Sequence, residues 1–397
     1  MKSAAAWICL VGLVAACAGS PHSPKPASGD KLYEAVSGGK QPMLAVIDSR
    51  SHNAERTLAL GVPSADWKHV YTTVGTSLVE TDSATADTVN TLQLHGAYHL
   101  PAATANGVPG GLSPDGRWLV VERFDGSATR MLVIDTTSLE IQREVALSGQ
   151  FEFDAIDDLA ANLYLIQRLD GRDYYVRRYD LGAGSLSPDI IFDKSDGSQA
   201  MTGLRLSGVP SADGQWLFSV YVRAHQSPFI HALNLGAPFA LCLDLPGRGY
   251  VDDPAEMQWS LAVTPDGSRI FAVNTATGDV AIVNIGLSGP AIARTGRFNV
   301  GSSTAPLMRG AVVSVNMLIA GGSDGLTWID TSSLKVVARS IPGWSIAGVG
   351  LSPDGKHLYA VSAQGRIAEI AIGSHAIEAM FDPLVGTPMA LMRVAAA

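Results

Sequence analysis

Side chains that could do chemistry gather in four long, irregular segments of the sequence. Two histidines four residues apart suggest a metal pair, a group of carboxylates suggests a calcium loop, and arginines could clamp an anionic ligand. The candidate residues are His95, Tyr98 and His99 in segment 94–107, Arg248, Asp252, Asp253 and Glu256 in 245–259, Met308 and Arg309 in 300–310, and Trp344 in 342–345.

None of these groups carries a motif that commits it to a reaction. His95 and His99 lie in a stretch with glycine and proline, where a four-residue spacing has no helical meaning, and no CxxC or HExxH motif accompanies them. The carboxylates of 252–256 match no EF-hand pattern. The chain has no phosphate-binding loop of the form G-x-x-x-x-G-K-[ST]. We therefore predict no metal and no cofactor; the arginines either bind an anionic ligand or pair with the nearby carboxylates.

The first 29 residues predict export and a lipid anchor. Lys2 precedes an apolar run at 4–16 that is too short to span a bilayer, which is typical of a secretory signal. The run ends in Val-Ala-Ala-Cys17, which resembles the lipobox of bacterial lipoproteins. That resemblance implies cleavage before Cys17 and acylation of its thiol, whereas the alternative is an ordinary signal peptide that contains Cys17. We predict a signal at 1–16, a Pro- and Ser-rich tether at 17–29, and one domain at 30–397.

Net charge and cysteine content further narrow the class of protein. The formal net charge is −9 and no Lys/Arg run is present, which argues against a nucleic-acid partner. Of three cysteines, Cys9 lies in the signal and Cys17 is the expected anchor, so Cys242 has no disulfide partner. We expect Cys242 to be a buried structural thiol in a strand.

The elements that must position these loops repeat along the chain. "GLSPDGRWLVV" at 111–121 recurs almost unchanged as "GLSPDGKHLYAV" at 350–361, and related strings begin at 62, 209 and 262. Pro presets the first corner of a turn, Asp stabilises it, and Gly accepts a positive φ, so the string predicts a hairpin turn before a strand. The apolar residues that open these strands lie 38 to 54 residues apart: Leu32, Val70, Leu119, Leu163, Leu217, Ile270, Leu318 and Leu358.

A second landmark follows each strand by 12 to 17 residues, where Asp or Asn ends an apolar run. Such residues bond the backbone two residues on and begin turns, so we interpret them as turn residues rather than as a metal or catalytic series. They are Asp48, Asp82, Asp135, Asp180, Asn234, Asn284 and Asp330, with Ala371 in the last copy.

A unit of about 47 residues accommodates four short strands with tight turns. Units of this form resemble the blades of YVTN-type and WD-like bacterial β-propellers. The resemblance implies an all-β propeller of four-stranded antiparallel blades. Residues 30–60 supply the last three strands of a blade and 387–394 a lone strand, so we expect these ends to pair and close the ring. The count favours eight blades, with seven as the alternative.

The leading functional hypothesis is a lipid-anchored, extracytoplasmic binding or scaffolding module at a bacterial membrane. Its candidate residues would lie on rim loops that engage a protein, a peptide or an envelope ligand. The alternative is an enzyme, because propellers resembling this one include lactonases, other hydrolases and dehydrogenases. That alternative requires His99, Arg248, Glu256 and Arg309 to converge at the channel mouth.

Overall fold

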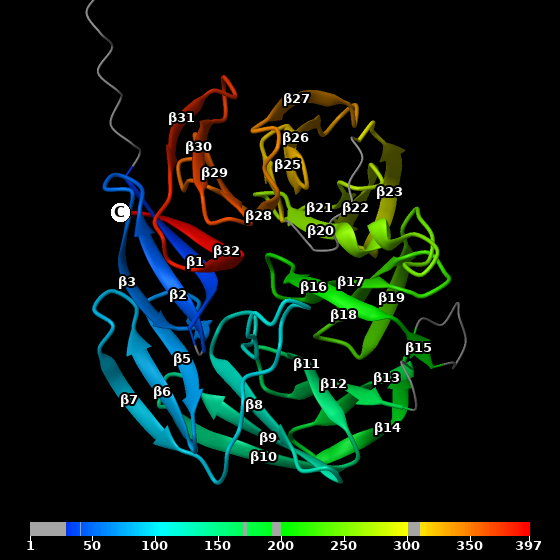
Figure 1. Ribbon diagram of the computed structural model, residues 1–397. Helices are drawn as coiled ribbons and strands as arrows, with labels where there is room; N and C mark the ends of the chain where they lie inside the picture. The colour runs from blue at the N-terminus through cyan, green and yellow to red at the C-terminus, as the bar shows by residue number, and fades with distance from the viewer. Residues whose placement is uncertain (1–28, 40, 170–172, 193–199, 301–309) are drawn as a thin grey trace, which may run out of the picture.

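The computed structural model describes residues 29–397 except for 40, 170–172, 193–199 and 301–309. Within these ranges the chain forms eight antiparallel sheets that follow one another around a ring (Figure 1). We call the sheets blades 1 to 8 in chain order. The prediction of eight blades is confirmed, and the seven-blade alternative is wrong.

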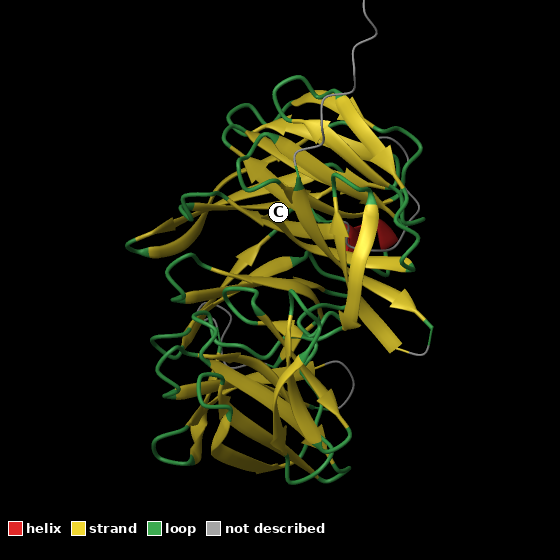
Figure 2. Cartoon of the chain, turned by 90° about the vertical axis from the view of Figure 1, so that its left-hand side faces the viewer, coloured by secondary structure: helices red, strands yellow, loops and turns green. Residues whose placement is uncertain are grey.

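Strands account for nearly all regular structure in the described chain (Figure 2). Blade 1 contains β1 (Asp30–Gly38), β2 (Gln41–Asp48), β3 (Asn53–Ala59) and β32 (Thr387–Ala396). Blade 2 contains β4 (Val62–Pro63), β5 (His69–Val74), β6 (Ser77–Asp82) and β7 (Thr88–Gln93). Blade 3 contains β8 (Trp118–Phe124), β9 (Ala128–Asp135) and β10 (Glu140–Ser148). Blade 4 contains β11 (Phe151–Ile156), β12 (Asn162–Arg168), β13 (Asp173–Asp180), β14 (Ser185–Ile191) and β15 (Met201–Thr202).

The second half of the ring is more regular. Blade 5 contains β16 (Leu204–Pro210), β17 (Trp216–Val222), β18 (Phe229–Asn234) and β19 (Phe239–Asp244). Blade 6 contains β20 (Trp259–Val263), β21 (Arg269–Asn274), β22 (Asp279–Gly286) and β23 (Gly289–Arg297). Blade 7 contains β24 (Ala311–Ser314), β25 (Met317–Gly322), β26 (Gly325–Asp330) and β27 (Val336–Ser340). Blade 8 contains β28 (Ile346–Leu351), β29 (His357–Ser362), β30 (Ile367–Ala371) and β31 (Ile377–Phe381).

Blade 3 departs from the four-stranded pattern at its inner edge. Its sheet has three strands in the order β10-β9-β8, and the place of the innermost strand is taken by isolated bridges to β8, first between His99 and Glu122 and then between Leu112 and Leu119. The segment before the second bridge carries a long insertion, residues 99–110. The blade therefore keeps its packing against its neighbours but has a shortened inner strand.

The ring closes by pairing of the two ends of the domain. β32 is the innermost strand of blade 1 and runs antiparallel to β1, with Leu32 opposite Val394 and Ser37 opposite Thr387 (Figure 1). Two register shifts interrupt this ladder, between Tyr33 and Glu34 and between Ala35 and Val36. The Tyr359 hydroxyl of blade 8 also lies 2.9 Å from an oxygen of Asp30 at the start of β1. Closure by the C-terminal strand is thus confirmed, and it pairs the open edge of β1.

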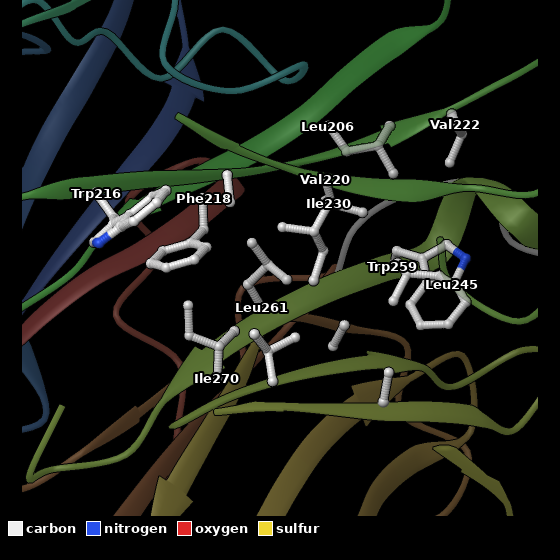
Figure 3. Packing of buried hydrophobic residues seen from close by; sticks show 14 residues of the cluster. Leu206, Trp216, Phe218, Val220, Val222, Ile230, Leu245, Trp259, Leu261 and Ile270 are labelled. Atoms are coloured by element: carbon white, nitrogen blue, oxygen red, sulfur yellow. The ribbon is translucent and has the colours of Figure 1, made fainter. Parts of the chain in front are cut away.

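The core lies between neighbouring blades. The second strand of each blade is buried on both faces, which explains its nearly continuous apolar sequence. Between blades 5 and 6, Trp216, Phe218 and Val220 of β17 pack with Leu261 and Ile270 of the next sheet (Figure 3). Phe218 and Ile270 are fully buried.

The repeated turn strings form hairpins between the first and second strands, as predicted. In "SPDG" at 352–355 the Ser352 hydroxyl contacts Asp354 at 2.7 Å and accepts from the His357 N–H at 2.9 Å, while Gly355 has φ of 67°. Hydrogen bonds from the Ser352 hydroxyl and, second, from the Lys356 N–H lower the pKa of Asp354 to about 2. In the copy that has Trp instead of Gly, Trp67 itself adopts φ of 63°, and its ring packs edge-on against Tyr33 at 5.1 Å.

The Asp landmarks also act as turn residues. Asp48 accepts from the N–H groups of Arg50 and Ser51 at 2.8 Å, and Asp82 and Asp330 accept in the same manner. They end the third strand of successive blades and are spread around the ring, so they form turns and not one site.

Helix is confined, in the described chain, to one short 3-10 segment, η1 (Pro254–Gln258). No helix there is long and apolar enough to cross a membrane. Cys242 lies on β19 and is half-buried rather than fully buried, packing against the cluster between blades 4 and 5.

Candidate ligand site on the loop face

The two faces of the ring carry different connections. On one face, which we call the turn face, lie the hairpins between first and second strands and between third and fourth strands. The other face, the loop face, carries the remaining hairpins and the connections between blades. Backbone hydrogen bonds hold these together: Tyr250 of a blade connection donates to the Arg223 carbonyl of a hairpin at 2.9 Å, and Gly325 donates to the Trp344 carbonyl.

The insertion in blade 3 crosses the loop face above the centre of the ring. We call residues 99–110 the channel loop (Figure 1). Its base is tied to β8 by two backbone bonds of 2.9 Å between His99 and Glu122. At its tip the Ala105 N–H donates to the Leu206 carbonyl of blade 5 at 3.0 Å, and the Asn106 amide donates to the Met389 carbonyl of blade 1 at 2.8 Å. Blades 1 and 5 stand on opposite sides of an eight-bladed ring, so the loop spans the channel.

A cavity of about 320 Å³ lies beneath this loop. Its walls come from the loop and from the channel-side parts of blades 3, 4 and 5. The residues that line it are Ala102, Ala103, Thr104, Ala105, Glu122, Glu152, Phe153, Ile166, Arg168, Tyr174, Gly203, Leu204, Arg205 and Tyr221.

Two ion pairs stand at this cavity. Arg168 binds Glu152 through two contacts, Nε to Oε1 at 2.8 Å and Nη2 to Oε2 at 2.6 Å. Arg205 donates to Asp154 at 2.9 Å, and the Asp154 side chain is almost completely buried. Bidentate and buried pairs of this kind are stronger and more directional than exposed surface pairs. They hold both arginines in place at the wall.

Glu122 and Glu152 are the two carboxylates that line the cavity. Glu122 is 8 % exposed, and its Oε2 accepts from the Phe153 N–H at 2.8 Å. Burial raises the pKa of Glu122 and repulsion by Glu152 adds to this, against the opposing effects of the Phe153 N–H and His99.

An aromatic layer supports the floor. The rings of Tyr174 and Tyr221 stack at 5.6 Å, and the Arg168 guanidinium lies 5.9 Å from the centre of the Tyr174 ring. Burial raises the pKa of both tyrosines above the usual range, so they stay protonated across the physiological pH range.

A second, more open hollow of about 650 Å³ lies on the same face beside blade 5. It contains two residues of the predicted set, Arg248 and Asp252, together with Arg223 and His225. Asp252 approaches His225 at 3.5 Å and Arg223 donates to Asp244 at 3.0 Å. The structure thus brings these two predicted residues together in one hollow.

Glu256 and Asp253 serve the local structure of their loop. Glu256 is 2 % exposed and accepts from the Arg248 N–H at 2.7 Å and from the Trp259 indole at 2.9 Å. Asp253 caps the short helix η1 by accepting from the Ala255 N–H at 3.0 Å. The contact between Arg248 and Glu256 is made by the backbone of Arg248 and leaves its side chain in the hollow.

Two aromatic candidates lie in the core. Tyr98 is 4 % exposed and packs between blades 2 and 3, with the Arg123 guanidinium 5.0 Å from its ring. Trp344 is 6 % exposed and packs between blades 7 and 8 beneath Arg366. Their rings contribute to inter-blade packing rather than to an exposed rim.

Among the described candidates, the two histidines do not line the hollow that contains Arg248 and Asp252. His95 and His99 are both exposed, and the His99 ring contacts the carbonyl of Leu100 at 3.3 Å. Met308 and Arg309 lie outside the described residues. His99 borders blade 3 whereas Arg248 and Glu256 stand between blades 5 and 6, so the described members of the proposed catalytic set belong to different blades.

The charged residues of the cavity were not predicted from the sequence, because they lie within strands. A usable signal existed in the charged residues that interrupt apolar strands near one edge of blades 3 to 5. They are Glu122 in "LVVERF", Glu152 and Asp154 in "FEFDAI", Arg168 in "LYLIQR" and Arg205 in "GLRLSG".

A cluster with potential metal ligands appears elsewhere, in blade 8. Ligand atoms of His357, Glu369 and Glu378 lie within 4.8 Å of one another. The His357 Nε2 is already 3.0 Å from Glu378, and the Tyr359 hydroxyl lies 3.1 Å from Glu369. Because the Tyr359 hydroxyl also contacts Asp30, the arrangement connects blade 8 to the start of β1 and supports ring closure.

Comparison with known proteins bears on the fold. The sequence matches no protein-family model and no curated protein. Among solved structures it is similar to dihydro-heme d1 dehydrogenase NirN in complex with DHE, at 14 % identity, covering 94 % of this chain and 76 % of that one with a TM-score of 0.55. It is also similar to the computationally designed Ika8 protein, at 12 % identity, 92 % coverage of both chains and a TM-score of 0.50. BamB from Moraxella catarrhalis gives 14 % identity, 88 % and 94 % coverage, and a TM-score of 0.47.

At these identities the likeness concerns the fold alone. The eight sheets that follow one another around a ring make the protein an all-β, eight-bladed β-propeller with WD-like repeats.

Proposed function

We propose that this propeller is a lipid-anchored, extracytoplasmic binding module of a bacterial envelope that engages a protein, peptide or envelope ligand through its loop face. The signal, the lipobox-like sequence at Cys17 and the YVTN-like repeats support export and anchoring. The tether at 17–29 would let the disc stand away from the membrane.

One observation carries the binding role. A propeller needs only short connections, yet the channel loop spans the ring from blade 1 to blade 5 and roofs a cavity with charged walls. Ligand-binding residues are commonly carried on loops that a rigid scaffold holds in place. The open hollow at Arg248 extends the same face.

The anchor is tested by fractionation of cells that express the protein or its Cys17→Ser variant. The native protein should sediment with membranes and incorporate labelled acyl chains, whereas C17S should do neither. Equal membrane association of both proteins would contradict the anchor.

The binding face is tested by photo-crosslinking in intact cells, with a photoreactive residue at one of two exposed positions. Val251 lies on the loop face and is 56 % exposed, whereas Leu287 lies in a turn-face hairpin and is fully exposed. We expect one specific adduct from position 251 and none from 287. Adducts from 287 alone would contradict the proposal.

A further inference from the structure

The charges at the cavity beneath the channel loop do not balance. Glu152 is neutralised by Arg168 and Asp154 by Arg205, each at hydrogen-bond distance. Glu122 is left over: within the described chain, no arginine or lysine lies within 4 Å of its carboxylate. An ionised Glu122 therefore gives the cavity an excess of one negative charge.

Glu122 has capacity for another donor. A carboxylate offers about four acceptor positions, and the Phe153 N–H occupies one, on Oε2. The side chain is nine-tenths buried, so water compensates its charge poorly. A buried carboxylate in this state gains most from a cation that brings its own N–H donors.

The rest of the cavity suits the body of such a ligand. Phe153, Ile166 and Leu204 supply apolar wall, and the loop above presents the small side chains of Ala103 and Ala105. About 320 Å³ lies at the lower end of the volumes of small-molecule pockets, so it accommodates one short chain. Arg168 and Glu152 at the rim are 34 % and 39 % exposed, which leaves a side open to solvent.

We propose that this cavity binds a ligand through an ammonium or guanidinium group that pairs with Glu122. The group belongs either to a small free amine or to a basic side chain of a peptide. An anionic ligand is disfavoured, because it would have to displace Glu152 or Asp154 from the arginines. This inference rests on the proposed binding function, since it names the group that the loop face takes up, but it does not depend on the lipid anchor.

The proposal makes binding depend on pH in one direction. The groups that face Glu122 are Glu152, Arg168 and Arg205 on the walls, His99 at the base of the loop, and the tyrosines of the floor. Because the pKa of Glu122 is raised, acid neutralises it and leaves an amine ligand charged. Affinity for a cation should rise as pH increases from 5 to 8.

The test is calorimetric titration of the purified full-length protein with agmatine, with n-pentanol as the neutral probe and glutarate as the anionic probe. Agmatine should bind, and the other two should not. Glu122→Gln should weaken agmatine binding at least tenfold, and Glu122→Asp should retain part of it. Glu144→Gln is the matched control, because Glu144 is an exposed carboxylate of the same blade paired with Arg130; it should bind as the native protein does.

Thermal unfolding of each variant shows whether the fold is kept. If E122Q does not fold, the probe selectivity and pH profile of the native protein still decide the matter. Equal binding to folded E122Q, preference for glutarate, or no binding of agmatine or of a blocked lysine peptide would overturn the proposal. Tighter binding of N-acetyl-lysine methylamide than of agmatine would identify a peptide side chain as the source of the cation, and the reverse order a free amine. Adducts from position 251 without cation binding would defeat this inference alone.

Discussion

The turn face and the loop face of this propeller are built from the same eight repeats, yet they differ in regularity. On the turn face, Ser352 and Asp354 repeat the contacts of Ser113 and Asp115 almost atom for atom. On the loop face, a connection in blade 3 spans the whole channel while others are a few residues long. Regular turns build the ring, and the departures from regularity build the cavity. Changes to the scaffold should therefore cost stability, and changes to the cavity should cost binding.

The largest effect is expected at the ring closure. Leu391 of β32 packs with Leu32 and Val36 of β1 between blades 8 and 1. Leu391→Asp places an unpaired charge there and should lower the free energy of unfolding by roughly 4 kcal/mol or more. The control is Leu384→Asp, because Leu384 is 86 % exposed just before the strand. Urea unfolding should separate the two variants, and equal stability would mean that the ring does not close through β32.

The next effect concerns a buried carboxylate in the same closure. Glu34 is fully buried and has no hydrogen-bond partner among the described residues, and burial, aided by repulsion from Asp382, raises its pKa to about 8. Between pH 4.5 and 8 the folded protein holds a proton that the unfolded chain has released, so stability falls as pH rises across this window. Glu34→Gln should remove this dependence and be more stable than the native protein at pH 7, by roughly 3 kcal/mol.

Urea unfolding of native protein, Glu34→Gln and Glu140→Gln at pH 5 and pH 8 provides the measurement. Glu140 is exposed, so its variant should follow the native pH profile. The E34Q advantage should be small at pH 5 and largest at pH 8. A native protein whose stability does not decline over this range would contradict the buried position of Glu34.

A smaller loss is expected in a single turn. The Ser352 hydroxyl is 4 % exposed, contacts Asp354 and accepts from the His357 N–H. Ser352→Ala should cost roughly 1–2 kcal/mol, because the part-buried His357 N–H loses its hydroxyl acceptor. Ser374→Ala removes a hydroxyl of an exposed turn in the same blade and should cost little. Thermal unfolding should show this order of stability. An S352A variant as stable as the native protein would contradict a stabilising role for the turns.

The smallest effect on stability is expected in the channel loop. Asn106→Ala removes the hydrogen bond to Met389 and should cost about 1 kcal/mol or less, because the loop lies at the surface. The same change should speed amide hydrogen exchange in residues 103–108 and leave the turn at 352–357 unaffected. Unchanged exchange in the loop would show that its tip is not held by β32.

Much of this architecture was predictable because it depends on local turn chemistry. Ser-Pro-Asp-Gly specifies a hairpin wherever it occurs. The three strands expected in 30–60 and the lone strand in 387–394 could complete a blade only by pairing with each other. The site was harder, because it depends on which blades adjoin and which way a strand faces. Trp344 and Tyr98 occur in segments whose composition resembles that of rim loops, and yet both side chains lie in the core. Glu122 and Arg205 look like ordinary strand residues until three blades bring them together.

The most direct test of the difference between the faces is hydrogen–deuterium exchange of the protein, purified and in native envelope membranes. We predict slower exchange in the membranes at the channel loop and at residues 223–228 and 247–253. The turns at 65–68, 213–216 and 353–356 should exchange at the same rate in both samples. Protection of those turns, with the channel loop unchanged, would contradict the account.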